Sequence, residues 1–364
     1  MEPLFDDFRT LVKRRRPLVD VRAPVEFKRG AFPGAVNLPL MNDKEREAVG
    51  ICYKREGNEA AVRLGHELVN EAVRASRIEA WCRFVKDNPD ALLYCFRGGQ
   101  RSRIAQEWMV RAGCPIPRLK GGYKAFRRFL IEETERISER LSPLILAGRT
   151  GSGKTRLLKL IDRSIDLEAL ANHRGSAFGA RLSPQPTQID FENSVAYDLI
   201  EKSDRFGSAL LFEDEGRNVG RLYLPRPLFL SLERAPLIVL QTPIEERVTN
   251  TWKEYVIEAQ KSFEEAGADD SLTKWSEMIA AAMKRIERRL GGKRYATVRR
   301  MLDEASLSQR KSGSKQPHRE WVRYLLENYY DPMYDYQIAK RGERVLFRGS
   351  FDEVAAYLKE ALYR

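Results

Sequence analysis

The sequence predicts an α/β protein with two doubly wound, mostly parallel sheets and a helical, basic C-terminal region. Three observations support this prediction. Short apolar runs with strand character alternate with helical stretches up to Pro243. Two of these runs lead directly into glycine-rich loops that open a helix. Beyond Pro243 the chain becomes strongly charged and keeps helical periodicity.

The length of 364 residues is too great for one typical domain and suits two or three. We expect one domain over residues 1–138, a second over 139–245, and a helical region over 246–364 that completes the second half. No apolar run approaches the roughly 20 residues needed to cross a bilayer. The N-terminal stretch MEPLFDDFRT lacks the layout of a signal peptide. We therefore expect a cytoplasmic protein without membrane association.

The net charge of +12 points to a polyanionic partner, with nucleic acid as the first candidate. Such a surplus also keeps proteins in solution, so charge alone leaves this question open. The helix expected over 278–290 places apolar residues on one face. Exposed basic residues there, and in the stretch that follows, would suit an RNA backbone or simply a solvated face. They are Lys284, Arg285, Arg288, Arg289, Lys293, Arg294, Arg299 and Arg300.

Four cysteines are present: Cys52, Cys82, Cys95 and Cys114. None forms a CxxC pair, so we expect no zinc site and no other bound metal centre. In a cytoplasmic chain we expect thiols and no disulfides. Cys82 and Cys114 have a structural character, and Cys52 is either a buried thiol or a second redox residue.

The elements of the first half follow in order. A buried strand is expected at 18–21, a turn-rich segment at 30–39, and helical structure at 44–76. A second strand at 91–95 (ALLYC) leads into a glycine-rich loop, and helices are expected at 101–112 and 123–141. In the second half, strands are expected at 144–148, 209–213 and 236–241.

The stretch LLYCFRGGQRSRIAQ (92–106) places Cys95 at the end of a strand. Gly98 and Gly99 allow the backbone to curl, so that successive N–H groups converge on one point. The next helix directs its positive end there, and Arg97 and Arg101 add charge. Such a cradle stabilises a thiolate and holds an oxyanion. We predict Cys95 as the nucleophile, with Arg97 and Arg101 beside it.

Together with this loop, the segment Leu18–Pro39 (LVDVRAPVEFKRGAFPGAVNLP) resembles the rhodanese domain. Residues 1–138 would then form a rhodanese-like domain, in which Asp20 and Arg22 are structural. The resemblance implies that the loop cysteine carries sulfur as a persulfide. The loop reads C-x5-R, one residue longer than the common sulfurtransferase loop. A wider cradle of this kind suits a phosphate-like substrate.

Residues 148–155 (GRTGSGKT) match the P-loop pattern GxxxxGK[ST], between an apolar strand and a helix. Backbone N–H groups of such a loop wrap phosphates, the lysine reaches the terminal ones, and a Mg²⁺ ion, where used, binds the threonine hydroxyl. We predict phosphate binding by Gly148, Thr150, Gly151, Ser152, Gly153, Lys154 and Thr155.

A carboxylate at the end of the strand ALLFE would complete this P-loop site. Asp214 is our candidate, with Glu215 as the alternative and a solvated acidic turn as the simpler interpretation. The motif shows affinity for a chain of phosphates, which ATP and a prenyl diphosphate both possess.

A rhodanese-like unit followed by a P-loop unit, taken over nearly the full length, resembles the tRNA 2-selenouridine synthase family. The stretches that carry the resemblance are 49–69, 95–102, 148–155, 167–179, 212–220 and 329–337.

The resemblance implies a transferase that modifies uridine 34, the wobble position, of certain tRNAs. Geranyl diphosphate would alkylate 2-thiouridine on sulfur, and selenophosphate would then replace the S-geranyl group through Cys95. The P-loop would hold the prenyl diphosphate. The implied partners are the tRNA anticodon region and an enzyme that supplies selenophosphate.

Three other functions stay open at this point. An ATP-dependent rhodanese-type sulfurtransferase acting on RNA would use the P-loop to activate the acceptor. A non-catalytic nucleotide switch would leave intact Cys95 and Lys154 without a purpose. A C-x5-R phosphatase would need an acid beside the loop, and none is evident in the sequence.

Overall fold

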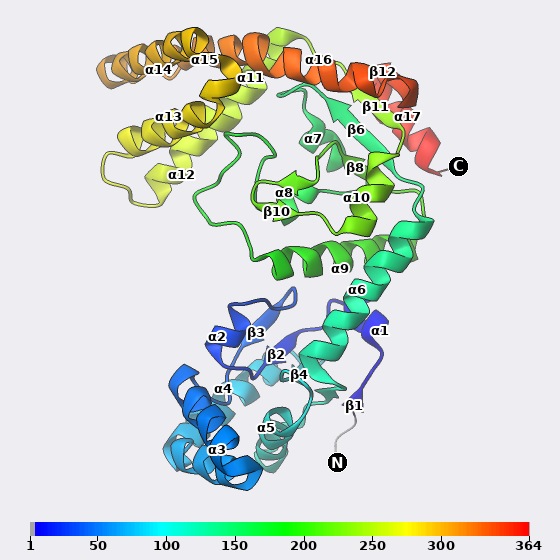
Figure 1. Cartoon of the computed structure of the whole chain (residues 1–364), viewed down its shortest axis with the longest axis vertical. Helices are drawn as coiled ribbons and strands as arrows, with labels where there is room; N and C mark the ends of the chain where they lie inside the picture. The colour runs from blue at the N-terminus through cyan, green and yellow to red at the C-terminus, as the bar shows by residue number, and fades with distance from the viewer. Residues whose placement is uncertain (1–3, 364) are drawn as a thin grey trace. The chain divides into compact units, whose positions relative to one another are not determined.

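The computed structural model describes residues 4–363, and the α/β prediction is confirmed (Figure 1). The chain divides into two compact units. The first runs to Ile137 and also includes Thr187–Asp204, whereas the second comprises Ser138–Pro186 and the chain from Arg205 onward. The boundaries expected from sequence, at 138 and 245, remain a prediction.

The first unit contains a five-stranded sheet in the order β1-β5-β4-β2-β3, in which every pairing is parallel. Its central strands β2 and β4 are wholly buried, as expected for a parallel sheet covered on both faces. The strands are β1 (Leu4–Phe5), β2 (Leu18–Asp20), β3 (Ala35–Asn37), β4 (Leu92–Tyr94) and β5 (Arg118–Leu119).

Seven helices belong to the described part of this unit, and one of them returns from later in the sequence. They are α1 (Phe8–Lys13), α2 (Pro24–Phe27), α3 (Asp43–Leu68), α4 (Glu71–Asp87), α5 (Gln100–Arg111), α6 (Gly122–Arg140) and α9 (Gln188–Phe206).

Helix α9 joins the first unit through buried polar contacts. The side chain of Asp190 accepts from the N–H of Ala31 at 2.7 Å, and the Asn193 amide donates to the Ala31 carbonyl at 2.6 Å. Gly30 has a φ of +154°, and a Cβ there would collide with Ile189. The turn-rich segment at 30–39 is therefore the docking point of α9.

Asp20 and Arg22 are buried and paired, as their structural interpretation requires. The Arg22 guanidinium donates to the Asp20 carboxylate at 2.6–3.0 Å and to the Gly30 carbonyl at 2.9 Å. It also lies 4.0 Å from the ring centroid of Tyr123. Because these partners neutralise the charge and satisfy the donors, the pair can stay out of water.

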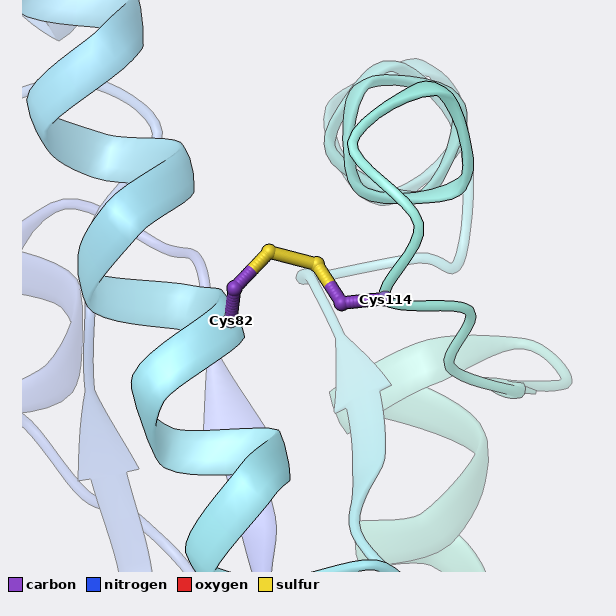
Figure 2. Close-up of a disulfide and its surroundings, with 2 residues drawn as sticks. All are labelled: Cys82 and Cys114. Atoms are coloured by element: carbon purple, nitrogen blue, oxygen red, sulfur yellow. A yellow bond between two sulfur atoms is a disulfide. The ribbon is translucent and has the colours of Figure 1, made fainter.

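The expectation that every cysteine is a free thiol is wrong for one pair. Cys82 on α4 and Cys114, just after α5, form a disulfide whose Cα atoms are 5.6 Å apart (Figure 2). This separation lies within the range that a disulfide spans. The two residues are separated by 32 positions in sequence, so their approach depends on how α4 and α5 pack. Cys52 and Cys95 remain free thiols.

The second unit has a parallel sheet in the order β12-β11-β6-β8-β7, with the P-loop strand β6 at its centre. Sequence patterning did not predict the edge strand β12, which lies inside the C-terminal region expected to be helical. The strands are β6 (Leu144–Gly148), β7 (Ser164–Ile165), β8 (Leu211–Glu213), β11 (Leu237–Leu240) and β12 (Val345–Gly349). A small antiparallel hairpin is formed by β9 (Asn218–Val219) and β10 (Leu222–Tyr223).

Helix α17 covers this sheet together with α7, because Val354, Leu358 and Leu362 share a core with Leu146 and Leu157. A second core forms among the helices that follow β11 (Figure 1, yellow to orange). The helices of the unit are α7 (Lys154–Leu158), α8 (Leu167–Leu170), α10 (Arg226–Glu233), α11 (Ile244–Trp252), α12 (Ala259–Glu265), α13 (Ser271–Leu290), α14 (Gly292–Ser312), α15 (His318–Leu325), α16 (Asp331–Lys340) and α17 (Phe351–Tyr363). The π-helices η1 (Lys253–Glu258) and η2 (Leu326–Tyr330) and the 3-10 helix η3 (Gly342–Arg344) join some of them.

None of the helices between residues 4 and 363 is both long enough and apolar enough to cross a bilayer.

Candidate functional site

Cys95 directly follows β4 and lies at the bottom of its loop, with 3% of its surface exposed. Its thiol donates to the Ser102 hydroxyl at 3.2 Å, and this hydroxyl donates to the Gly99 carbonyl at 3.1 Å. Ser102 is itself in the first turn of α5. The thiol is therefore held at a helix N-terminus, where partial positive charge favours an anion.

The loop can take this shape because two glycines meet behind it. Gly98 and Gly122 have φ values of +66° and +58°, and a Cβ on Gly122 would collide with the Cys95 carbonyl and the Gly98 nitrogen. The N–H of Tyr123 donates to the Cys95 carbonyl at 2.9 Å, and that of Lys124 to the Phe96 carbonyl at 2.9 Å. The start of α6 therefore supports the loop from behind and leaves its open side to a ligand.

The two arginines of the loop have different environments. Arg101 forms a two-point ion pair with Glu26, at 2.5 and 3.1 Å, which fixes its guanidinium beside the loop. Arg97 is exposed, and its guanidinium lies 6.0 Å from the ring centroid of Phe96. Arg101 is therefore positioned in advance, whereas Arg97 faces solvent.

The P-loop joins β6 to α7 and brings its seven predicted residues into one turn. Gly151 and Gly153 have φ values of +79° and +92°, which only glycine adopts readily. A Cβ on Gly148 would lie 2.6 Å from the Ser152 hydroxyl, so this position also requires glycine. Lys154 donates to the Gly148 carbonyl at 2.8 Å, and Thr155 is exposed.

Helix α11 supports the back of the P-loop with polar side chains. Asn250 donates to the Gly151 carbonyl at 2.9 Å, and Arg247 donates to the Thr150 carbonyl at 3.3 Å. Arg247, only 1% exposed, also forms a two-point ion pair with Asp331, at 2.6 and 2.7 Å. The P-loop conformation thus depends on a buried charge pair.

The stretch 329–337 is one of those on which the family resemblance rests. It supplies the acidic partners of two arginines at the P-loop. Asp331 accepts from Arg247, and Asp335 accepts from Arg149 of the P-loop at 2.7–3.0 Å. Tyr329 and Tyr330 are buried in the helical core. Tyr336, in the same stretch, is 62% exposed.

Asp214, our predicted carboxylate, forms a two-point ion pair with Arg341 at 2.6 Å. A different set of carboxylates, Glu168, Glu213 and Glu215, gathers around the end of β8. Burial, together with the repulsion from Glu168, raises the pKa of Glu213 and of Glu215 well above the usual range. Lys154 counteracts this rise at Glu215, so the cluster lies within electrostatic reach of the P-loop lysine.

Within residues 4–363, no group of three or more His, Cys, Asp or Glu side chains is placed to hold a metal ion. The exposed Thr155 hydroxyl is suited to Mg²⁺ carried in with phosphates, because this ion usually keeps several waters and takes few protein ligands.

The basic face predicted for the C-terminal region is built mainly by α13 and α14. Ile279, Met283, Ile286 and Leu290 are buried, as the periodicity predicted. The polar side exposes Arg288, Arg289 and Lys293, none of which forms an ion pair with another residue of the described chain.

Comparisons with known proteins agree with this architecture. Residues 5–129 match the rhodanese-like domain, and residues 141–364 match the tRNA 2-selenouridine synthase AAA domain. The chain belongs to the tRNA 2-selenouridine synthase family. A family member from Sulfurovum sp. (strain NBC37-1) is 56% identical over 358 residues, which cover 98% of each chain. Members from Hydrogenovibrio crunogenus and Hahella chejuensis are each 48% identical, over 99% and 97% of this chain and 99% and 93% of theirs.

Membership in the family makes the chain an enzyme. Four residues that support its two loops could not be found from the sequence, namely Glu26, Arg247, Asn250 and Asp331. Each supports a loop from a distant part of the chain, so no local motif marks it. The available signal was that Asp331 and Glu26 lie in stretches on which a family resemblance rests, 329–337 and Leu18–Pro39, where neither residue had an assigned role.

Proposed function

We propose that this enzyme acts in the cytoplasm and converts 2-thiouridine at the wobble position, position 34, of tRNA to 2-selenouridine. The reaction would use geranyl diphosphate first and selenophosphate second. The observation that carries the proposal is a buried thiol, Cys95, at the bottom of an anion cradle, in a chain that also contains a complete P-loop. The names of the relatives support the same product.

In the first step, the sulfur of 2-thiouridine attacks the allylic carbon of geranyl diphosphate. A C–S bond forms, the C–O bond breaks, diphosphate leaves with the electron pair, and the N3 proton of the base passes to solvent. Lys154 and the P-loop N–H groups would hold this diphosphate and stabilise the charge that grows on it as the bond breaks. Alkylation also turns sulfur into a good leaving group for the second step.

In the second step, selenium replaces the S-geranyl group at C2 of the base, geranylthiol leaves, and water releases phosphate from the P–Se bond. Selenium keeps its oxidation level throughout, so the exchange needs no external oxidant. Arg101 and the loop N–H groups would hold the selenophosphate oxygens, and selenium transfer occurs at Cys95. The exposed Arg97 would close over the donor.

The RNA would lie against the basic side of α13 and α14, where Arg288, Arg289 and Lys293 are exposed. Phosphate contacts of this kind contribute affinity without sequence preference. The anticodon region would present its wobble base, and selenophosphate would come from a separate supplying enzyme. Mg²⁺, if bound with the diphosphate, would use the Thr155 hydroxyl and neutralise phosphate charge.

The test incubates purified protein with 2-thiouridine tRNA and geranyl diphosphate, then with selenophosphate, and analyses the nucleosides by mass spectrometry. We expect Lys154→Ala to block geranylation. We expect Cys95→Ala to accumulate the S-geranyl nucleoside without selenium, and Cys52→Ala, a free thiol outside the loop, to behave as wild type. If wild type leaves 2-thiouridine unchanged with both donors, the proposal fails. ATP turnover and a Cys95 persulfide would then be measured, as an ATP-dependent sulfurtransferase requires.

A further inference from the structure

We propose that an apolar cavity beside the Cys95 loop binds the geranyl chain of the S-geranyl intermediate during selenium transfer. The inference rests on the proposed function and adds the place where the apolar part of the substrate lies. The cavity lies wholly within the first unit, between α3 and the start of α5, and has a volume of about 520 Å³ (helices labelled in Figure 1). This is a usual size for a small-molecule pocket.

The walls of the cavity are mainly apolar. Val49, Ala61, Ile104 and Trp108 line it. Trp108 belongs to the core of the first unit, Val49 and Ile104 pack against that core, and Ala61 is buried. A hydrocarbon chain bound there would move out of water and onto apolar walls that are backed by the core of the first unit. Because each CH₂ group that leaves water adds to binding, this is a favourable place for such a chain.

The cavity exists because of the unusual form of α3. Gly57, with a φ of +85°, breaks this helix, and both halves then contribute to the walls. Gly50 and Gly65 lie inside the two halves and also line the cavity. Glycine inside a helix is less favourable than alanine, so these two positions lower the stability of the helix while they leave the cavity open. A Cβ on Gly50 would meet no atom within 4 Å.

The location connects the cavity with the reacting atoms. Gln100 and Arg101, which close the C-x5-R loop, are part of the wall. A chain that enters here therefore has its sulfur end next to the cradle that contains Cys95. The prenyl group would act as an anchor that brings C2 of the base to the selenium donor.

The charges around the cavity favour a nucleic acid as the carrier of the chain. Arg46, Lys54 and Arg101 contribute to its lining, against one acidic residue, Glu47. An anionic backbone attached to an apolar chain matches this combination of dry walls and basic residues, whereas a neutral lipid or an apolar peptide uses only the walls. Unmodified 2-thiouridine lacks the chain, so the cavity would select the alkylated base.

The experiment measures binding of the nucleoside S-geranyl-2-thiouridine to the full chain by calorimetry, with S-methyl-2-thiouridine as the short-chain control. We expect wild type to bind the geranyl nucleoside at least about tenfold more tightly. Gly50→Leu fills the cavity and should remove this preference. Ala48→Leu adds the same side chain to the same helix outside the cavity and should keep it. Because leucine is a better helix former than glycine, Gly50→Leu should melt no lower than wild type.

The same variants are then given pre-geranylated tRNA and selenophosphate, which bypasses the first step. We expect Gly50→Leu to raise the KM for this tRNA at least about tenfold and Ala48→Leu to leave it unchanged. If Gly50→Leu binds the geranyl nucleoside and turns over the tRNA like wild type, the cavity is not the prenyl site. If wild type forms no 2-selenouridine but binds the geranyl nucleoside in a Gly50-dependent way, the proposed reaction fails and the cavity assignment stands.

Discussion

The Cys95 loop and the P-loop have the same strand–loop–helix arrangement and differ in the residue that stands where the strand ends. Each follows a buried parallel strand, curls through glycines and ends at the start of a helix. The first strand is followed by Cys95, and the second ends on Gly148. We therefore expect both loops to bind anions through backbone N–H groups, whereas only the first carries a thiol. From this comparison we expect the cradle to decide which ligands bind and the one side chain to decide the chemistry.

The two loops are also supported differently. Behind the Cys95 loop, Gly98 and Gly122 meet through their backbones, and the buried Arg118 guanidinium donates to the Gly98 carbonyl at 3.2 Å. Behind the P-loop, Arg247 and Asp331 form a buried ion pair. The first support should therefore be sensitive to added side-chain volume and the second to removed charge. Asp331→Asn and Gly122→Ala test this difference directly, and changes at the disulfide and at Glu213 compare the two units further; the expected effects run from the largest to the smallest.

Asp331→Asn should have the largest effect, because it leaves the Arg247 guanidinium buried without its counter-ion. Breaking a buried pair in this way typically costs about 3–5 kcal/mol. We expect a lower Tm for the second unit and loss of geranylation, with selenium transfer to pre-geranylated tRNA retained. Asp335→Asn removes the half-exposed partner of Arg149 and should cost about 1 kcal/mol or less. Equal melting of the two variants would show that the ion pair does not support the P-loop.

Loss of the Cys82–Cys114 disulfide should affect the unit that contains Cys95. A crosslink between residues 32 positions apart contributes about 3–4 kcal/mol in the chain-entropy description. We expect Cys82→Ser to lower the Tm of the first unit, and Cys52→Ser to leave it unchanged. Thiol titration of the denatured wild type should find two reactive cysteines. Four would show that the bond is absent in solution.

Gly122→Ala tests the volume-sensitive support. The alanine Cβ would collide with the Cys95 carbonyl at a φ of +58°, so we expect a loss of about 2–3 kcal/mol and of selenium transfer. Geranylation should remain. Gly99→Ala is the matched control, because Gly99 lies in the same loop at a φ of −91°, and an added methyl group there would meet no atom within 4 Å. If both alanines behave alike, close backbone contact is not what shapes the loop.

Glu213→Gln should have the smallest effect and a distinct pH dependence. Burial raises the pKa of Glu213 well above 4.5, so the folded chain binds a proton more tightly than the unfolded chain. Wild-type stability therefore falls as pH rises from about 4.5 towards the raised pKa. The neutral glutamine avoids this loss, and we expect it to be more stable than wild type by about 1 kcal/mol at pH 8 and equal to it near pH 4.

Glu133→Gln serves as the control of opposite sign. Arg136 and Arg9 overcome the effect of partial burial and hold the pKa of Glu133 below its usual range. Its ion pairs stabilise the fold above the ordinary carboxylate pKa, and this stability is lost as pH falls through the lowered value. The glutamine variant should accordingly be less stable than wild type at neutral pH. Melting curves at pH 4, 6 and 8 separate the two directions.

Sequence patterning predicted most of the fold, because its buried strands are continuous apolar runs and its two loops have local glycine motifs. The strands β2, β4, β6, β8 and β11 and the helices α5 and α6 lie where they were expected. The edge strand β12 was not predicted, because its residues alternate in burial and it follows a long helical region. The disulfide was not predicted, because we expected a cytoplasmic chain and cysteines in the cytoplasm are usually free thiols.

The sequence by itself determined the two cradles, since a strand, a glycine-rich loop and a helix are built from neighbouring residues and obey local backbone rules. It also determined the basic character of α13. Only the tertiary structure decided what supports each cradle, because Gly122, Glu26, Arg247 and Asp331 reach their loops from distant segments. It alone decided the cavity beside Cys95, since an empty volume results from how helices pack and leaves no pattern in any single stretch of chain.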